Sequence, residues 1–354
     1  MKNGGIIRLI SIFSIFILVC FYNFFDLLNM QNFKIVANEN ILVNDTFQGK
    51  KDEKKNQEKE TEKTESQPEK EQVNAEKAEN SSSTVQTSAQ AVKGKIISQY
   101  ISPYKASHSY DKVYLKNSTN LKIDLKSLLS STLSFKIKKS ELPQVLILHT
   151  HATETYMQSD AEYYTENFSS RTKDTSKNMV KIGEIVAKKL NNGGIVTLHD
   201  KTLHDSPQYS GSYTRAAKTI TSYLKKYPSI KVVLDLHRDA VSSGKNDKVK
   251  LVTEINGKKA AQIMIVMGSQ SGSVTNFPNW KENLKLAVKL QQIIEEKYPT
   301  LARPLSLMPK NYNESLTKGS LLLEFGTDAN SLEEACYSAE LVGDSILSLL
   351  KTLE

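Results

Sequence analysis

Histidines and carboxylates follow directly after three apolar segments of the sequence. The three stretches read LILHTHATETY (146–156), VLDLHRDA (233–240) and LLLEFGTDAN (321–330). Imidazole nitrogens and carboxylate oxygens are ligands that zinc prefers, and a carboxylate beside a metal-bound water is suited to general base catalysis. These residue types indicate metal-assisted chemistry, provided that the fold brings the three stretches together.

The first stretch holds the densest set of candidate ligands. His149 and His151 lie two residues apart, hence on one face of an extended strand, and Glu154 follows three residues after His151. A single histidine in this position more often forms a hydrogen bond in the core. Two histidines and a glutamate this close together favour a zinc site instead.

The other two stretches supply partners for that set. Asp235 shares a strand face with His237 and would orient its imidazole, and Arg238 adds a permanent cation. Glu324, after three leucines, would be a desolvated general base. The alternatives are an Asp235–Arg238 salt bridge, or a pairing of Glu324 with Arg238 or a lysine.

Other chemistries find less support. His199 and His204 are possible replacement ligands, and His108 is expected at the surface. The sequence contains no Gly-x-Ser-x-Gly elbow, no Gly-rich nucleotide loop and no zinc-type cysteine pair. With two cysteines in 354 residues, a disulfide scaffold is also excluded.

The elements that must position these residues read as an α/β fold. Apolar runs of strand length alternate with amphipathic helical runs, which predicts a mostly parallel twisted sheet with helices on both faces. Asp174 is expected to cap the first long helix, and Asp328 or Asn330 the last. Asn256-Gly257 predicts a hairpin turn, and residues 94–143 an accessory layer or edge hairpin. Strands are expected at 144–150, 194–199, 230–237, 304–308 and 319–326, and helices at 174–194, 212–227, 279–298 and 330–352.

The N-terminal part has a different organisation. Residues 9–28 are almost entirely apolar and predict a transmembrane anchor, with residues 1–8 in the cytoplasm because Lys and Arg precede the run. A cleaved signal peptide is the alternative, and both imply export. Residues 29–93 include a run of lysine and glutamate with few apolar side chains, which predicts a disordered tether. Residues 94–354 would then form one catalytic domain.

The HTHATETY and LDLHRDA motifs, with HDSPQYSGSYTRA and LLLEFGTDANSLEEA, resemble the stage II sporulation protein P family of endospore-forming Firmicutes. The resemblance implies a fold related to zinc-dependent N-acetylmuramoyl-L-alanine amidases. It also implies a membrane-anchored peptidoglycan amidase and endopeptidase in septal wall thinning and engulfment, in the intermembrane space of the sporulating cell. Stage II sporulation proteins D and M are the implied partners. Matching motifs make His151 and His237 the implied ligands and Glu324 the catalytic carboxylate.

The middle ligand departs from the pattern of other zinc amidases, which take a glutamate from near the start of the first helix. That region reads RTKDTSKN here and has no glutamate, so Glu154 is expected to complete the Zn²⁺ site, with Glu162 and Glu166 in reserve. His149 is the alternate first ligand. Arg238 is expected to bind substrate, through the oxyanion or a stem-peptide carboxylate.

Two other functions remain open, a zinc carboxypeptidase or endopeptidase acting on stem peptides and a non-enzymatic wall-binding scaffold. The net charge of +8 is compatible with all three. Residues 1–49 are neutral and residues 50–80 carry −2, so that residues 81–354 carry +10. Export excludes nucleic acid as the partner of this basic part and leaves the anionic cell wall.

Overall fold

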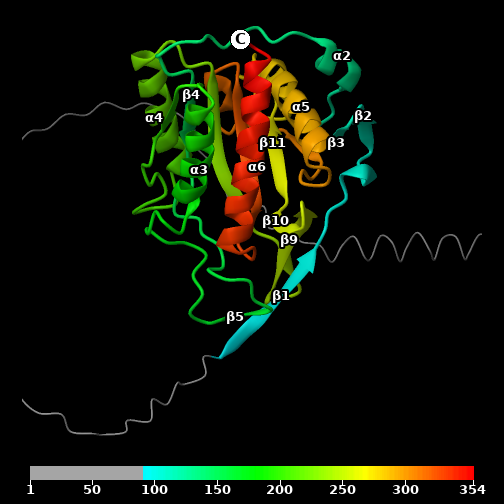
Figure 1. The fold of residues 1–354 in the computed structure, drawn as a ribbon, viewed down its shortest axis with the longest axis vertical. Coiled ribbons are helices and arrows are strands. Elements are labelled where there is room, and N and C mark those ends of the chain that lie inside the picture. Colours follow the sequence, from blue (N-terminus) through cyan, green and yellow to red (C-terminus); the bar gives the residue numbers. More distant parts are fainter. Residues whose placement is uncertain (1–90) are drawn as a thin grey trace, which may run out of the picture. The chain divides into compact units, whose positions relative to one another are not determined.

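The computed structural model describes residues 91–354 (Figure 1). The predicted cytoplasmic end, the anchor at 9–28 and all but the last residues of the tether lie outside these residues. Within them, no helix is both long and apolar enough to cross a membrane. The first described strand begins at Val92, two residues before the boundary predicted at Gly94.

The main sheet contains eight strands in the order β2-β3-β12-β11-β13-β7-β4-β6. The central strands begin with mainly apolar, buried residues because the core covers them, and polar residues occur toward the ends of β7 and β13. The edge pair β2–β3 is the hairpin expected within residues 94–143. The bounds are β2 His108–Tyr110, β3 Val113–Asn117, β12 Leu305–Met308, β11 Ile263–Gly268, β13 Ser320–Thr327, β7 Val232–Asp239, β4 Val145–Leu148 and β6 Thr197–His199.

The sheet is mixed, so the prediction of a mostly parallel sheet is correct only in part. The group β6, β4, β7 and β13 is parallel, and so is the group β11, β12 and β3. The two groups meet antiparallel at β11 and β13. Parallel neighbours need a long crossover, usually a helix, whereas the chain reaches β11 from β7 through a hairpin. Because this connection contains a hairpin and no crossover helix, β11 can run antiparallel to β13 and β7.

A smaller sheet is built around the hairpin and the first described strand. The hairpin strands turn at Asn256 and Gly257, both with positive φ, as predicted from this residue pair. Strand β1 pairs with β9 in parallel and with β5 antiparallel. The bounds are β1 Val92–Gln99, β5 Tyr163–Thr165, β8 Ser242–Ser243, β9 Asp247–Ile255 and β10 Lys258–Ala261.

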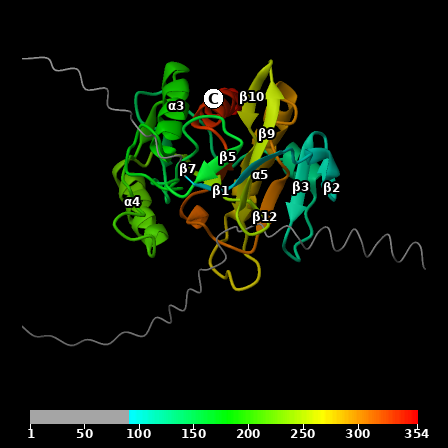
Figure 2. The same cartoon turned by 90° about the horizontal axis from the view of Figure 1, so that it is seen from below.

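Helices cover the main sheet unevenly. Helices α3, α5 and α6 pack on one face in the largest hydrophobic core, whereas α4 packs on the other face against Leu146, Leu148 and Val233. Figure 2 shows α3 and α4 on opposite sides of the sheet. Both faces are therefore covered, as expected, but not equally. The helices are α2 Leu125–Ser130, α3 Met179–Asn192, α4 Ser212–Lys226, α5 Trp280–Lys297 and α6 Leu332–Lys351, with short 3₁₀ turns η1 Pro103–Lys105 and η2 Glu314–Leu316.

The uneven cover leaves one part of the sheet open. Helix α4 packs on β4 and reaches η2, which contacts β13, and among residues 91–354 no α-helix is seen over β11 and β13 on that side, where Leu322 is buried but Met264 is partly exposed. On β13, Leu321, Leu323 and Phe325 face the large core, whereas Glu324 alternates to the open side and is partly exposed.

Two predicted helix caps are wrong. Asn178, not Asp174, caps α3 by accepting a hydrogen bond from the Val180 N–H. Asp174 instead accepts bonds from the Ser176 N–H and hydroxyl, in a turn that precedes the helix. Ser331 caps α6 in a capping box with Glu334, in place of Asp328 or Asn330.

The buried face of β13 allows a stability prediction. Leu323 is fully buried in the large core, so Leu323→Ala should lower the free energy of unfolding by about 2–5 kcal/mol. The matched control is Leu142→Ala at a residue that is 59% exposed, where a change within about 0.5 kcal/mol is expected. Urea denaturation followed by circular dichroism measures both, and equal effects would contradict the assigned orientation of β13.

Candidate active site

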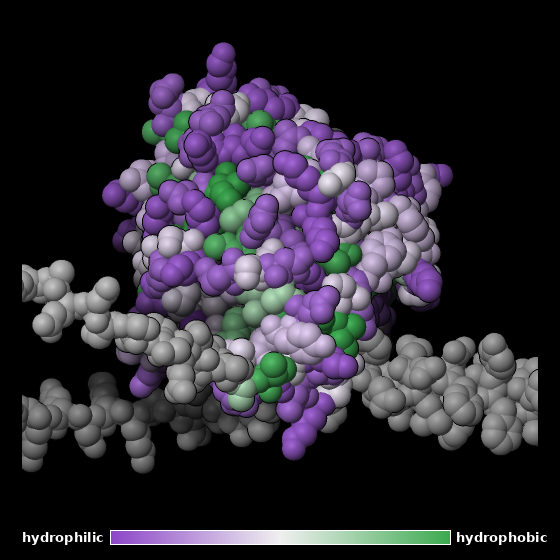
Figure 3. Space-filling view, turned by 60° about the horizontal axis from the view of Figure 1, so that its bottom comes forward, coloured by the Kyte–Doolittle hydropathy of each residue, from purple (hydrophilic) through white to green (hydrophobic). Residues whose placement is uncertain are grey.

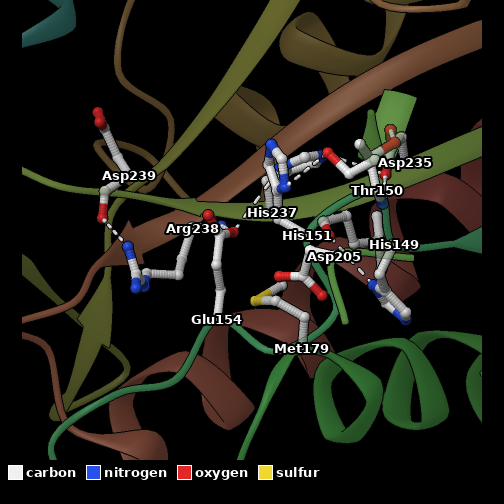
Figure 4. A network of polar contacts seen from close by, with 12 residues as sticks. His149, Thr150, His151, Glu154, Met179, Asp205, Asp235, His237, Arg238 and Asp239 are labelled. Carbon is white, nitrogen blue, oxygen red and sulfur yellow. Dashed lines mark hydrogen bonds and ion pairs between the residues drawn. The ribbon is translucent and has the colours of Figure 1, made fainter. Parts of the chain in front are cut away.

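The three predicted strand ends meet in the structure. Strands β4, β7 and β13 are neighbours, and the register places Leu148 opposite Asp235 and His237 opposite Glu324. His151 follows β4 at once, and its ring lies 5.2 Å from that of His237, centroid to centroid (Figure 4). The sheet register therefore brings together residues that are far apart in the sequence.

The two histidines after β4 point to different places. His149 places Nδ1 3.0 Å from the Leu236 carbonyl and Nε2 2.9 Å from Nε2 of His199. Burial and His199 lower the pKa of His149 to about 3, so it is a neutral core residue. A Cβ on Gly183 of α3 would lie 2.5 Å from both Nε2 atoms, and this close packing requires glycine. The alternate first ligand, His149, thus lies outside the group around His237.

His151 is enclosed by residues that precede α4 or begin it. The ring of Tyr209 stacks on it at 4.4 Å with its hydroxyl 3.1 Å from Nε2, and Ser212 Oγ lies 3.4 Å from Nδ1. Tyr213 packs edge-on against His151 and stacks on His237. Burial, with the charges of His237 and Arg171, lowers the pKa of His151 to about 2. A neutral imidazole of this kind keeps a lone pair for a metal.

Tyr209, Ser212 and Tyr213 were not predicted as site residues. They lie in the HDSPQYSGSYTRA motif, which contributed to the family resemblance although no role was assigned to its aromatic side chains.

His204, one of the two replacement ligands considered from the sequence, begins the same motif and forms hydrogen bonds in the core. His204 is buried, with Nδ1 2.9 Å from the His149 carbonyl and Nε2 2.9 Å from the Thr219 hydroxyl.

Glu154 lies in the group as expected from its spacing. Its Oε2 is 3.7 Å from His237 Nδ1 and accepts a hydrogen bond from the Arg238 backbone N–H at 3.2 Å. Its Oε1 lies 3.5 Å from an Arg171 nitrogen. The reserves Glu162 and Glu166 are both exposed beside β5 and away from this group.

Asp235 fixes His237. Its carboxylate lies 3.0 Å from His237 Nε2 and accepts bonds from the Thr150 N–H and hydroxyl. Burial alone would lower the pKa of His237, but Asp235, helped by Glu154 and Glu324, outweighs it and raises the pKa to about 10. The predicted orienting role of Asp235 agrees with these contacts, and the alternative Asp235–Arg238 salt bridge does not form.

Glu324 completes the group from β13. Its Oε2 is buried and has no hydrogen-bond partner among the described residues. Burial raises the pKa of Glu324, Asp239 and Glu154 add to the rise, and His237 and Arg303 oppose it. A carboxylate that is held without a partner beside imidazoles can accept a proton from a bound water.

The guanidinium of Arg238 does not point at this group, which contradicts its predicted contact with substrate. It donates to the carbonyls of Thr155, Ser170 and Asp239, and the residue is 6% exposed. Figure 4 shows it turned toward Asp239, away from His237. Arg238 instead binds the carbonyl of Thr155, which follows Glu154, and that of Ser170 in a separate segment.

The donor set formed by His151, Glu154 and His237 fits zinc by chemistry, with two imidazoles and one carboxylate. All three are buried and adjacent, and because Asp235 lies against Nε2 of His237, Nδ1 is the nitrogen on the Glu154 side. In residues 91–354 no three such side chains already point their donor atoms at one centre. His237 Nδ1 and Glu154 Oε2 are 3.7 Å apart, so these two donors could share a metal with His237 still held by Asp235.

Comparison with known proteins extends the sequence resemblance. The family model for stage II sporulation protein P matches residues 25–347. The chain belongs to this family. The stage II sporulation protein P of Bacillus subtilis (strain 168) is 29% identical over 211 residues, 56% of this chain and 49% of the relative. The chain thus matches about half the length of that relative.

Solved structures show a distant likeness. An N-acetylmuramoyl-L-alanine amidase from Clostridium difficile 630 is 18% identical, with a TM-score of 0.35 over 61% of this chain and 100% of the amidase. The CwlD amidase from Clostridioides difficile, in complex with the GerS lipoprotein, is 11% identical, with a TM-score of 0.39 over 59% of this chain and 98% of CwlD. TM-scores of this size support no conclusion about function.

The Asp235–His237 contact predicts a titration. In chelator-treated protein His237 should titrate near 10, and Asp235→Asn should return its pKa to 6.5 or below by removing the main opposing charge. Because the folded pKa lies above the unfolded one, this group stabilises the fold fully below pH 6.5, and the stabilisation is lost as the pH rises to about 10. Imidazole NMR measures the titration, and a value below 6.5 in the unsubstituted protein would contradict the contact.

Proposed function

We propose that the chain is a zinc-dependent N-acetylmuramoyl-L-alanine amidase that acts on peptidoglycan during septal wall remodelling and engulfment. The observation that carries the proposal is the meeting of His151, Glu154, His237 and Glu324 beside one another on the open part of the sheet. Membership of the family supports the sporulation role. The anchor at 9–28, an extracytoplasmic catalytic domain and partnership with stage II sporulation proteins D and M belong to the same proposal.

His151, Glu154 and His237 would hold the zinc ion, which when bound supplies a Lewis acid for the scissile carbonyl and lowers the pKa of its water. Glu324 would accept a proton from the attacking water as the water oxygen bonds to the carbonyl carbon, and would return this proton to the amine nitrogen as the carbon–nitrogen bond breaks. Asp235 keeps His237 oriented. Tyr209 and Tyr213 cover the imidazoles and limit access of bulk water.

The surface supports a solvated, anionic substrate. Residues 81–354 carry a net charge of +10. In Figure 3, the end of the molecule that carries the strand ends is turned toward the viewer, and it is mainly hydrophilic with small, separate apolar patches. Peptidoglycan stem peptides have carboxylates that such a basic surface attracts.

Glu324→Gln tests the general base. The amide cannot accept the water proton, so release of peptide from purified sacculi should fall by about 10²–10⁴-fold while sacculus binding is retained. Glu340→Gln, an exposed position on α6, is the matched control and should leave the rate unchanged. Mass spectrometry of the products separates the candidates, because an amidase leaves glycan free of peptide whereas a peptidase leaves a trimmed stem. Undiminished release by Glu324→Gln would refute the assignment.

Metal content tests the ligands independently of activity. The purified protein should contain about one zinc per chain by plasma mass spectrometry, and His151→Ala or His237→Ala should reduce this to a small fraction. His199→Gln, at the histidine that contacts His149, is the control and should keep the zinc. An unsubstituted protein without stoichiometric metal would favour the wall-binding scaffold.

A further inference from the structure

Arg303 has an incomplete set of contacts for a buried arginine. Only 4% of the residue is exposed, and Nη1 donates to Asp239 Oδ2 at 2.9 Å. The buried Nε and Nη2 atoms have no partner among the described residues. Leaving donors of a buried charged group unpaired is unfavourable, so an unpaired guanidinium edge calls for a functional explanation.

Arg303 lies beside the candidate active site. Its backbone N–H donates to the Ile263 carbonyl at the start of β11, and its partner Asp239 follows His237 by two residues on β7. The charge of Arg303 also opposes the rise in the pKa of Glu324, which places the two groups within electrostatic reach. Arg303 is thus the cation that Arg238 was expected to be.

Two partly exposed residues lie between Glu324 and the buried Arg303. Met264 lies opposite Glu324 in the ladder of β11 and β13, Pro304 follows Arg303, and both are partly exposed. This row lies over the strands that carry no helix on the open side. Methionine is unbranched and adaptable, so a ligand that approaches Arg303 along this row can displace the Met264 side chain.

We propose that Arg303 binds a free carboxylate on the peptide side of the scissile amide through Nε and Nη2. These two donors form one edge of the guanidinium, and such an edge pairs with a carboxylate through two parallel hydrogen bonds. Asp239 holds the remaining arm and is itself fixed by the Ala240 N–H at 2.8 Å, so the edge is preorganised. The inference rests on the proposed amide hydrolysis and specifies what the site recognises.

The test compares muropeptides that differ in one group. Each free carboxylate of the stem is replaced in turn by a carboxamide, and kcat/KM is measured for every pair. The unsubstituted protein should prefer the carboxylate form at one position by about 10–100-fold, the size of a charge-assisted pair. Arg303→Lys should retain part of this ratio, and Arg303→Met combined with Asp239→Asn should reduce it to about one. The ratio compares two substrates on one variant, so a partial loss of folded protein cancels.

Arg215→Met is the matched control. The guanidinium of Arg215 has its donors paired with the backbone carbonyls of His204, Gln208 and Ser210, so the variant should keep the full ratio. Equal cleavage of every carboxylate and carboxamide pair by the unsubstituted protein would overturn the role of Arg303 and leave the proposed hydrolysis standing. If no muropeptide is cleaved, the proposed function fails. The carboxylate site is then tested by calorimetry, in which each carboxylate and carboxamide pair is bound to the Glu324→Gln variant. Equal affinities within every pair would overturn the carboxylate site.

Discussion

The buried carboxylate of Asp235 is the interaction on which the candidate site depends. It joins two strand ends, because it binds the Thr150 N–H and hydroxyl after β4 and lies against His237 on its own strand. A buried carboxylate without such partners would be strongly unfavourable. Pairing of β4 with β7 in any other register would leave it unsatisfied. The register that satisfies Asp235 is also the one that puts His151 beside His237.

The order of the strands decides what the site can accommodate. Strand β13 lies parallel to β7, so Glu324 comes level with His237, whereas the antiparallel joint to β11 lies directly beyond it. Helix α4 covers only the β4 side of this face. The proposed substrate is a polymer that would have to lie across the site, and the part of the sheet without an α-helix would provide room for it. The mixed sheet and the uneven helical cover would then serve the same proposed function.

Local patterns in the sequence predicted most of the elements and the residues at three strand ends. Alternation along β7 and β13 placed Asp235 with His237 and set Glu324 apart from the core leucines, because this pattern depends only on the extended backbone. The direction of Arg238, the enclosure of His151 by Tyr209 and Tyr213, and the incomplete contacts of Arg303 depend on segments that meet only in the folded chain. The antiparallel pairing of β11 with β13 was not predicted for a similar reason. The hairpin turn can be recognised in the sequence, but the strand that β11 will pair with cannot.

The arginines hold in place a loop residue that is proposed as a ligand. Glu154 lies on a turn after β4, not on a helix, and such a position would ordinarily be imprecise. Arg238 binds the carbonyls of Thr155 and Ser170, and Arg171 reaches both Glu154 and Asp205. These contacts tie the turn to the segment before α3 and to the loop before α4. The hydrogen bonds that Arg238 donates to the backbone thus help to position the Glu154 carboxylate, whereas Arg303 keeps two buried donors without a partner among residues 91–354.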